Sequence, residues 1–175
     1  MLLTYLIVFV GLPGTGKSTL AYKLGKELNF TVIDKDILKS CLLLSNISES
    51  ISAPLSYNLV WELAKDLLIK QRQSLIIDSV AGIKKDIQIA QEICELSNSM
   101  LRIIACDTTD AVRQARIQSR ESLISQPNEL DFSNPRHFKR EIYLDNLPKT
   151  SLILETDSNS EDLVRLSMSY ILSKD

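Results

Sequence analysis

The chain has 175 residues, of which 45% are hydrophobic and 24% are charged, which is enough for the core of one globular domain and leaves little chain for a second. Its 20 basic and 22 acidic residues give a net charge of −2, which excludes a strong overall positive field that would draw it to nucleic acid or to an anionic membrane. The three cysteines are odd in number and far apart, which favours reduced thiols in a cytoplasmic protein over disulfides or a zinc site.

The first element is an apolar run at residues 5–10, which predicts a strand buried on both faces. We interpret the run as a strand and not as a signal peptide, because it lacks a charged leading segment and a cleavage site. No other apolar run approaches the length that spans a membrane, so we expect no membrane partner.

Residues 11–18 read G-L-P-G-T-G-K-S, the form of a phosphate-binding loop, and an amphipathic helix pattern follows them. Glycines let several backbone N–H groups converge on a polyphosphate at a helix N-terminus. We expect Lys17 to neutralise the β and γ phosphates and Ser18 to ligate Mg²⁺. The predicted nucleotide-binding residues are Gly11, Leu12, Pro13, Gly14, Thr15, Gly16, Lys17, Ser18 and Thr19. The guanine-specifying N-K-x-D pattern is missing, so the predicted cofactors are ATP and Mg²⁺.

Apolar spacing predicts the remaining elements in chain order. Strands are expected at residues 30–33, 74–78, 100–106 and 151–154. Helices are expected from near 16 to 28, at 37–44, 54–68, 83–94, 110–122 and 135–143, and from a Ser158/Glu161 capping box to 171. This alternation predicts an α/β fold, a three-layer αβα P-loop NTPase domain with a five-stranded parallel sheet that spans residues 1–175. A polar, aperiodic stretch at 125–134 predicts a mobile lid around residues 121–140.

Carboxylates stand at two predicted strand ends, where such sheets bind ligands. Asp34 and Asp36 would project to one side while strand geometry holds, and one of them could hold the magnesium shell while the other accepts a proton from an attacking hydroxyl. The alternative is that one simply caps the next helix. Asp78 ends its strand in the Walker-B manner and is a predicted metal ligand, with a turn aspartate as the alternative.

Arginines recur along the predicted helix at 110–122. Arg113, Arg116 and Arg120 would share one face, and their repulsion suggests a common anionic target, although a solvated face is the alternative. Tyr57 and Trp61 could frame an acceptor pocket, but core packing is the default for such side chains.

These motifs resemble a group of P-loop kinases that includes shikimate, gluconate and polynucleotide 5′-hydroxyl kinases and chloramphenicol phosphotransferase. The chain is most similar to the small AAA_33-type or zeta-toxin-like ATP-binding kinases, through G-L-P-G-T-G-K-S-T-L-A, I-D-K-D-I-L-K and R-Q-A-R-I-Q-S-R. The resemblance implies an adenylate-kinase-like strand order, 2-3-1-4-5.

The resemblance also implies roles for individual residues. The D-x-D of shikimate kinases maps to Asp34 as metal-linked and Asp36 as acceptor-facing, and the lid-helix R-x-x-x-R maps to Arg116 and Arg120 as catalytic phosphate clamps. In polynucleotide kinases a basic residue three positions beyond the catalytic aspartate meets the substrate, which would be Lys39. The chain departs from its relatives after Asp78, where Ser-Val replaces Thr-Asn, and the glycine triplet of shikimate kinases is missing, which argues against shikimate.

The resulting expectation is an ATP-dependent kinase in which Lys17, Asp36, Arg116 and Arg120 are catalytic and Ser18, Asp34 and Asp78 hold the metal. Its partners would be ATP and an unidentified hydroxyl acceptor, either a small molecule or a nucleic-acid 5′ end. The alternative is a nucleotide-sensing or regulatory ATP-binding protein with slow ATPase activity.

Overall fold

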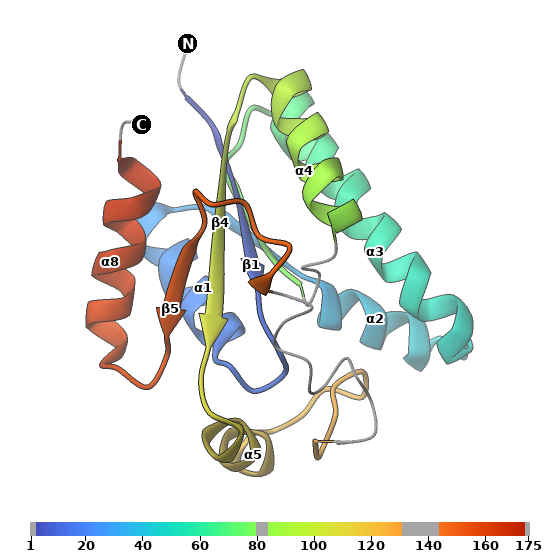
Figure 1. Ribbon diagram of the computed structural model, residues 1–175. Coiled ribbons are helices and arrows are strands. Elements are labelled where there is room, and N and C mark those ends of the chain that lie inside the picture. Colours follow the sequence, from blue (N-terminus) through green and yellow to red (C-terminus); the bar gives the residue numbers. More distant parts are fainter. Residues whose placement is uncertain (1–2, 80–83, 131–143, 174–175) are drawn as a thin grey trace.

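The computed structural model describes residues 3–79, 84–130 and 144–173, and within these residues a five-stranded parallel sheet forms the centre (Figure 1). Its strands are β1 (Tyr5–Val10), β2 (Thr31–Asp34), β3 (Leu75–Asp78), β4 (Met100–Asp107) and β5 (Leu152–Glu155). They lie in the order β2-β3-β1-β4-β5, with β1 paired to β3 and β4. The predicted fold class and strand order are therefore confirmed.

The central strand β1 is buried on both faces, as its unbroken apolar run predicts. Leu6 and Val8 point into one hydrophobic cluster, and Ile7 and Phe9 point into the other. The second cluster is covered by α1 (Lys17–Leu28) and α8 (Ser160–Leu172), and the first by α3 (Glu49–Lys65), the π-helical turn η1 (Asp66–Lys70) and α4 (Lys84–Ser97). Figure 1 shows these helices on opposite sides of the sheet, so the layers are helix, sheet, helix.

Helix α2 (Lys35–Leu44) begins two residues earlier than the sequence predicts. The reason is a cap: the Asp34 Oδ1 atom accepts a hydrogen bond from the Asp36 backbone N–H at 2.7 Å. Strand geometry therefore stops at Asp34, and Asp36 lies in the first helical turn. The assumption that both residues project from one strand is wrong, and the capping alternative holds for Asp34.

Two other helix starts also differ from expectation. Helix α3 begins at Glu49 and carries Pro54 inside it, so the predicted start at Pro54 is wrong. Packing of α3 against α2 and the sheet outweighs the local preference of proline for a first turn. Helix α8 is capped by Asn159, whose side chain accepts from the Glu161 N–H at 3.1 Å, and not by Ser158.

Helix α5 (Asp110–Ser119) ends three residues before the predicted 122, so Arg120 lies just beyond it in extended conformation. The predicted helix at 135–143 and the 131–140 part of the predicted lid lie outside the described residues. No helix in the described part of the chain is both long and apolar enough to cross a bilayer.

Candidate functional site

The phosphate-binding loop runs from the carboxyl end of β1 to the start of α1 and is pressed against neighbouring backbone. Gly11 has a φ of +145°, and a Cβ there would stand 2.3 Å from the Cys106 carbonyl oxygen. At Gly14, with a φ of +82°, a Cβ would stand 2.7 Å from the Arg113 carbonyl oxygen. Only glycine fits either place, so the open curl of backbone that a polyphosphate needs is built into the fold.

Two buried side chains hold this loop from behind. Arg113 is fully buried, and its Nε donates to the Pro13 carbonyl at 2.8 Å while NH1 pairs with Asp110 at 2.7 Å. The Thr156 Oγ1 atom donates to the Thr15 carbonyl at 2.7 Å. Arg113 therefore supports the loop, and both sequence interpretations of it, as an anion ligand and as a solvated charge, are wrong.

Lys17 lies at the base of the loop with its Nζ atom 2.9 Å from the Leu12 carbonyl, to which it donates. Burial lowers the pKa of this ammonium, and the nearby Asp78 carboxylate opposes that shift. Asp78 is only 5% exposed, and burial raises its pKa to about 6, against the opposing effects of Lys17 and a hydrogen bond with Ser18. A cation and an anion thus face each other where a polyphosphate and its metal would enter.

The oxygens at this corner suit Mg²⁺ carried by a nucleotide. Asp78 stands beside Asp34 on the neighbouring strand, and Ser18 hydrogen-bonds Asp78. Among residues 3–79, 84–130 and 144–173, no three His, Cys, Asp or Glu side chains gather as a metal-ligand cluster. Mg²⁺ commonly takes only one or two carboxylates and completes its shell with phosphate oxygens and water, so Ser18 and Asp78 fit that role.

Asp34 is committed to the protein through both carboxylate oxygens. Oδ1 caps α2, and Oδ2 accepts a hydrogen bond from the Tyr22 hydroxyl at 3.3 Å. Burial raises the pKa of Asp34, and burial together with Asp34 raises the pKa of Tyr22 to about 12. Tyr22 was missed in the sequence, because an aromatic residue on a helix carries no motif.

A cavity of about 880 Å³ opens over the carboxyl ends of the strands. Of the predicted site residues, those that line it are Pro13, Gly14, Gly16, Lys17, Ser18, Thr19, Asp34, Asp36, Asp78, Arg116 and Arg120. Gly11, Leu12 and Thr15 lie beneath it as buried support. Residues from seven separate elements and loops thus meet at one opening.

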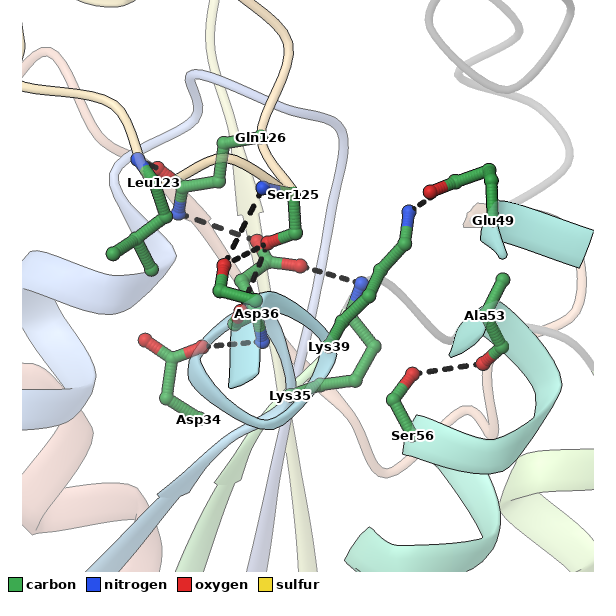
Figure 2. Close-up of polar contacts among 11 residues, drawn as sticks. Asp34, Lys35, Asp36, Lys39, Glu49, Ala53, Ser56, Leu123, Ser125 and Gln126 are labelled. Carbon is green, nitrogen blue, oxygen red and sulfur yellow. Dashed lines mark hydrogen bonds and ion pairs between the residues drawn. The ribbon is translucent and has the colours of Figure 1, made fainter. Parts of the chain in front are cut away.

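Asp36 lies on the α2 side of this cavity, and both of its carboxylate oxygens have partners. Oδ1 pairs with the Lys35 ammonium at 2.5 Å, and Oδ2 accepts from the Gln126 amide at 3.2 Å. Figure 2 shows Gln126 and Ser125 reaching Asp36 from the loop beyond α5. Lys35 is itself buried and stands 5.5 Å from the centre of the Tyr57 ring.

The two predicted clamp arginines come from α5 and from the residue just after it. Arg116 donates to the Thr156 hydroxyl at 3.0 Å and to the Thr156 carbonyl at 2.7 Å, and it is half-buried. Arg120 donates to the Pro127 carbonyl at 3.1 Å. Both guanidinium groups are therefore held in place, Arg116 next to Gly16 of the phosphate-binding loop and Arg120 within electrostatic reach of Asp36.

The outer wall is formed by α2 and α3. Lys39 pairs with Glu49 at 2.5 Å, and both residues line the cavity together with Tyr57. Trp61 does not line it; its ring is buried in the core and its Nε1 donates to Asp86 at 3.3 Å.

The cavity residues that sequence reasoning missed include Tyr22, Lys35, Glu49, Gln126 and Thr156. Lys35 and Thr156 carried a usable signal, because each directly follows a strand at the ligand-binding edge of the sheet.

Comparison with known proteins identifies the family and the fold. Residues 6–142 match the AAA_33 family, described as an AAA domain. A comparison with curated proteins finds no match.

Solved structures share the fold at low sequence identity. A protein from Chloroflexus aurantiacus, provisionally described as a kinase, superposes with a TM-score of 0.72 at 19% identity, covering 97% of this chain and 99% of its own. The APS kinase of Mycobacterium tuberculosis, in complex with AMPPNP and APS, superposes with a TM-score of 0.67 at 17% identity, covering 97% of this chain and 98% of its own. Shikimate kinase from Bacteroides thetaiotaomicron superposes with a TM-score of 0.67 at 18% identity, covering 94% of this chain and 97% of its own. The chain therefore belongs to the AAA_33 family and has the fold of the P-loop kinases.

Proposed function

We propose that this protein is an ATP- and magnesium-dependent kinase that transfers the γ-phosphoryl group to a hydroxyl of a small molecule or of a nucleic-acid 5′ end. One observation carries the proposal: a single cavity joins the phosphate-binding loop to a carboxylate, Asp36, and to two arginines, Arg116 and Arg120. Transfer of a phosphoryl group needs a site for the donor, a base for the acceptor and positive charge around the moving group. The AAA_33 family and the kinase fold of the solved relatives support the same assignment.

Each wall of the cavity has a part in this reaction. The loop amides and Lys17 bind the triphosphate, with Lys17 against its outer phosphates. Ser18 and Asp78 hold Mg²⁺, beside the negative charge of Asp34, and the bound ion neutralises charge on the phosphate oxygens. Asp36 accepts the proton of the attacking hydroxyl, and Arg116 and Arg120 stabilise the charge on the γ-phosphoryl group.

The acceptor would enter between α2 and α3, where the wall is polar and charged on both sides. Lys35, Lys39, Glu49 and Tyr57 line this part of the cavity. A small polar hydroxyl compound and a 5′ end make different demands on it. A 5′ end would bring further phosphates, so its binding would weaken steeply as salt rises, whereas binding of a neutral hydroxyl compound would not.

The test is turnover of Asp36→Asn with Mg-ATP and a panel of hydroxyl compounds and 5′-hydroxyl oligonucleotides. With any acceptor that the wild-type protein phosphorylates, we expect turnover to fall on the order of 10²–10⁴-fold, since general-base catalysis contributes that much. Asp162→Asn is the matched control, because Asp162 lies on α8 outside the cavity, is half-exposed and, like Asp36, pairs with a basic side chain, that of Arg165. Unchanged turnover in Asp36→Asn refutes the base assignment.

A second function is favoured by the pairing of Asp36 itself. Both of its carboxylate oxygens are already paired, one with Lys35 and the other with Gln126. A carboxylate paired in this way is less able to accept a proton, which would suit a protein that binds ATP and hydrolyses it slowly. This sensing or regulatory role predicts that turnover stays at the rate without acceptor across the whole panel. Acceptor-dependent turnover excludes it.

A further inference from the structure

A short turn at residues 123–126, the guard turn, lies against Asp36. Its last residue, Gln126, donates from Nε2 to Asp36 Oδ2 at 3.2 Å, while the opposite oxygen of Asp36 pairs with Lys35. In Figure 2 the guard turn stands directly over the start of α2. The amide of Gln126 thus occupies the carboxylate oxygen that Lys35 leaves available to an acceptor.

The orientation of that amide follows from its second hydrogen bond. The Gln126 side-chain oxygen Oε1 accepts a hydrogen bond from the Leu123 backbone N–H at 3.3 Å. The backbone N–H of Gln126 donates to the Leu123 carbonyl at 2.9 Å. An amide has one acceptor and one donor end, so an oxygen committed to Leu123 leaves the NH₂ group facing Asp36. The side chain therefore offers Asp36 a donor, as a substrate hydroxyl would.

The guard turn is anchored to α2 through Ser125. The Ser125 hydroxyl donates to the Asp36 carbonyl at 2.8 Å and accepts from the Ser40 hydroxyl at 2.9 Å. Beyond the turn, Arg120 donates to the Pro127 carbonyl at 3.1 Å, which ties the same segment to a predicted catalytic residue. The Gln126 contact is thus part of a connected network and not an isolated surface hydrogen bond.

We propose that Gln126 is a positioning residue that stands in for the acceptor hydroxyl on Asp36 and so keeps water from using this carboxylate when no acceptor is bound. The inference rests on the proposed function. In hydrolysis, a water oxygen would bond to the γ phosphorus, the bond from that phosphorus to the β,γ-bridging oxygen would break, and the water proton would pass to Asp36, leaving ADP and phosphate. With Gln126 on Asp36, water has no base; a true acceptor displaces the amide and takes its place.

The mechanism predicts a gain of activity when Gln126 is shortened. Gln126→Ala in the full chain should raise ATP hydrolysis without acceptor by roughly 10- to 100-fold, a part of what a general base contributes. The affinity for Mg-ATP, measured by calorimetry, and the melting temperature should stay close to wild type. A residue that only held the loop in place would lower activity when removed.

Two further variants separate the explanations. The double variant Asp36→Asn/Gln126→Ala should show no gain, because the base itself is lost. Gln71→Ala is the matched control: Gln71 also donates to an aspartate, Asp66, at 2.7 Å, but at an exposed place outside the cavity. It should hydrolyse ATP at the wild-type rate.

Several outcomes overturn the inference. Gln126→Ala with normal ATP affinity and unchanged or slower hydrolysis excludes a guarding role, and a gain that persists in the double variant shows that hydrolysis does not pass through Asp36. This hydrolysis assay uses no acceptor, so its result does not depend on the panel of hydroxyl compounds and oligonucleotides. If Gln126→Ala hydrolyses ATP faster but the wild-type protein phosphorylates no member of that panel, the result counts against the kinase proposal alone. Failure of the wild-type protein to bind Mg-ATP would overturn both.

Discussion

The Thr156 hydroxyl donates a hydrogen bond to the Thr15 carbonyl 2.7 Å away, and so joins the end of the last strand to the phosphate-binding loop. The same hydroxyl accepts from Arg116 at 3.0 Å, and the Thr156 N–H donates to the Asp107 carbonyl at 2.8 Å. One buried threonine thus connects the phosphate-binding loop, the end of β4 and a predicted clamp arginine.

Replacing Thr156 by valine keeps the volume of the side chain but removes its hydroxyl, so the phosphate-binding loop should be held less firmly. We expect the free energy of unfolding to fall by about 1–2 kcal/mol, since a buried carbonyl loses its donor. Mg-ATP should bind several-fold more weakly, because the loop loses its donor and Arg116 loses one of its two hydrogen bonds to residue 156. Urea unfolding and calorimetry measure the two effects, and Thr156→Ser, which keeps the hydroxyl, should retain most of both. Equal behaviour of the valine and serine variants would show that the hydroxyl has no such role.

Arg113→Met should destabilise the whole protein. Arg113 is fully buried, and its removal takes away the donor to the Pro13 carbonyl and the ion pair with Asp110. We expect a loss of about 2–4 kcal/mol in the free energy of unfolding, from lost hydrogen bonds of a charged donor. Arg165→Met is the control, since Arg165 is exposed on α8 and such changes usually cost less than about 0.5 kcal/mol. Similar unfolding curves for the two variants would contradict the supporting role of Arg113.

Lys17→Met should abolish most of the turnover without unfolding the chain. The Lys17 ammonium lies in the cavity beside Asp78, where burial lowers its pKa. Removing one preorganised electrostatic partner of a transferring phosphoryl group costs on the order of 10²–10³ in rate. Acceptor-independent hydrolysis measured at saturating Mg-ATP checks this, with circular dichroism to show that the variant is folded. Wild-type hydrolysis in the variant would remove Lys17 from the mechanism.

The cysteines should differ sharply in their reaction with iodoacetamide. Burial raises the pKa of Cys94 and of Cys106 to about 12, whereas Cys41 is exposed. Only the thiolate reacts, and a raised pKa lowers its population, so at pH 8 the two buried thiols are about 10⁻⁴ ionised and stay unmodified. Their reactivity should rise only as the pH approaches 12.

Mass spectrometry after labelling at pH 8 should find Cys41 modified alone, and labelling in urea should modify all three. Modification of Cys106 before Cys41 in the folded protein would contradict both the burial and the pKa of Cys106.

Much of the fold could be predicted because its signals are local. The apolar run of β1, the glycines of the loop and the strand-ending carboxylates Asp34 and Asp78 are each legible within a few residues. Strand order entered through resemblance to known kinases, and the sheet confirms it. The assigned roles of the site residues stay predictions, although most of those residues line one cavity.

Errors arose where a distant part of the chain decides a local outcome. Pro54 is a good first helical residue in isolation, yet α3 starts at Glu49 because the helix packs on α2 and the sheet. The sequence around Arg113 is typical of a charged residue on a helix surface. In the structure Arg113 is buried against the phosphate-binding loop, and the Pro13 that it contacts lies 100 residues away in the chain.

The sequence by itself determined that a phosphate-binding loop sits between a buried strand and a helix, because glycine placement and apolar spacing act through the backbone nearby. Only the tertiary structure decided that Asp34 caps α2, that Thr156 and Arg113 hold the loop, and that Gln126 lies on Asp36. Those contacts join residues that no local pattern relates, since a hydrogen bond between distant segments depends on how the whole sheet and its helices pack.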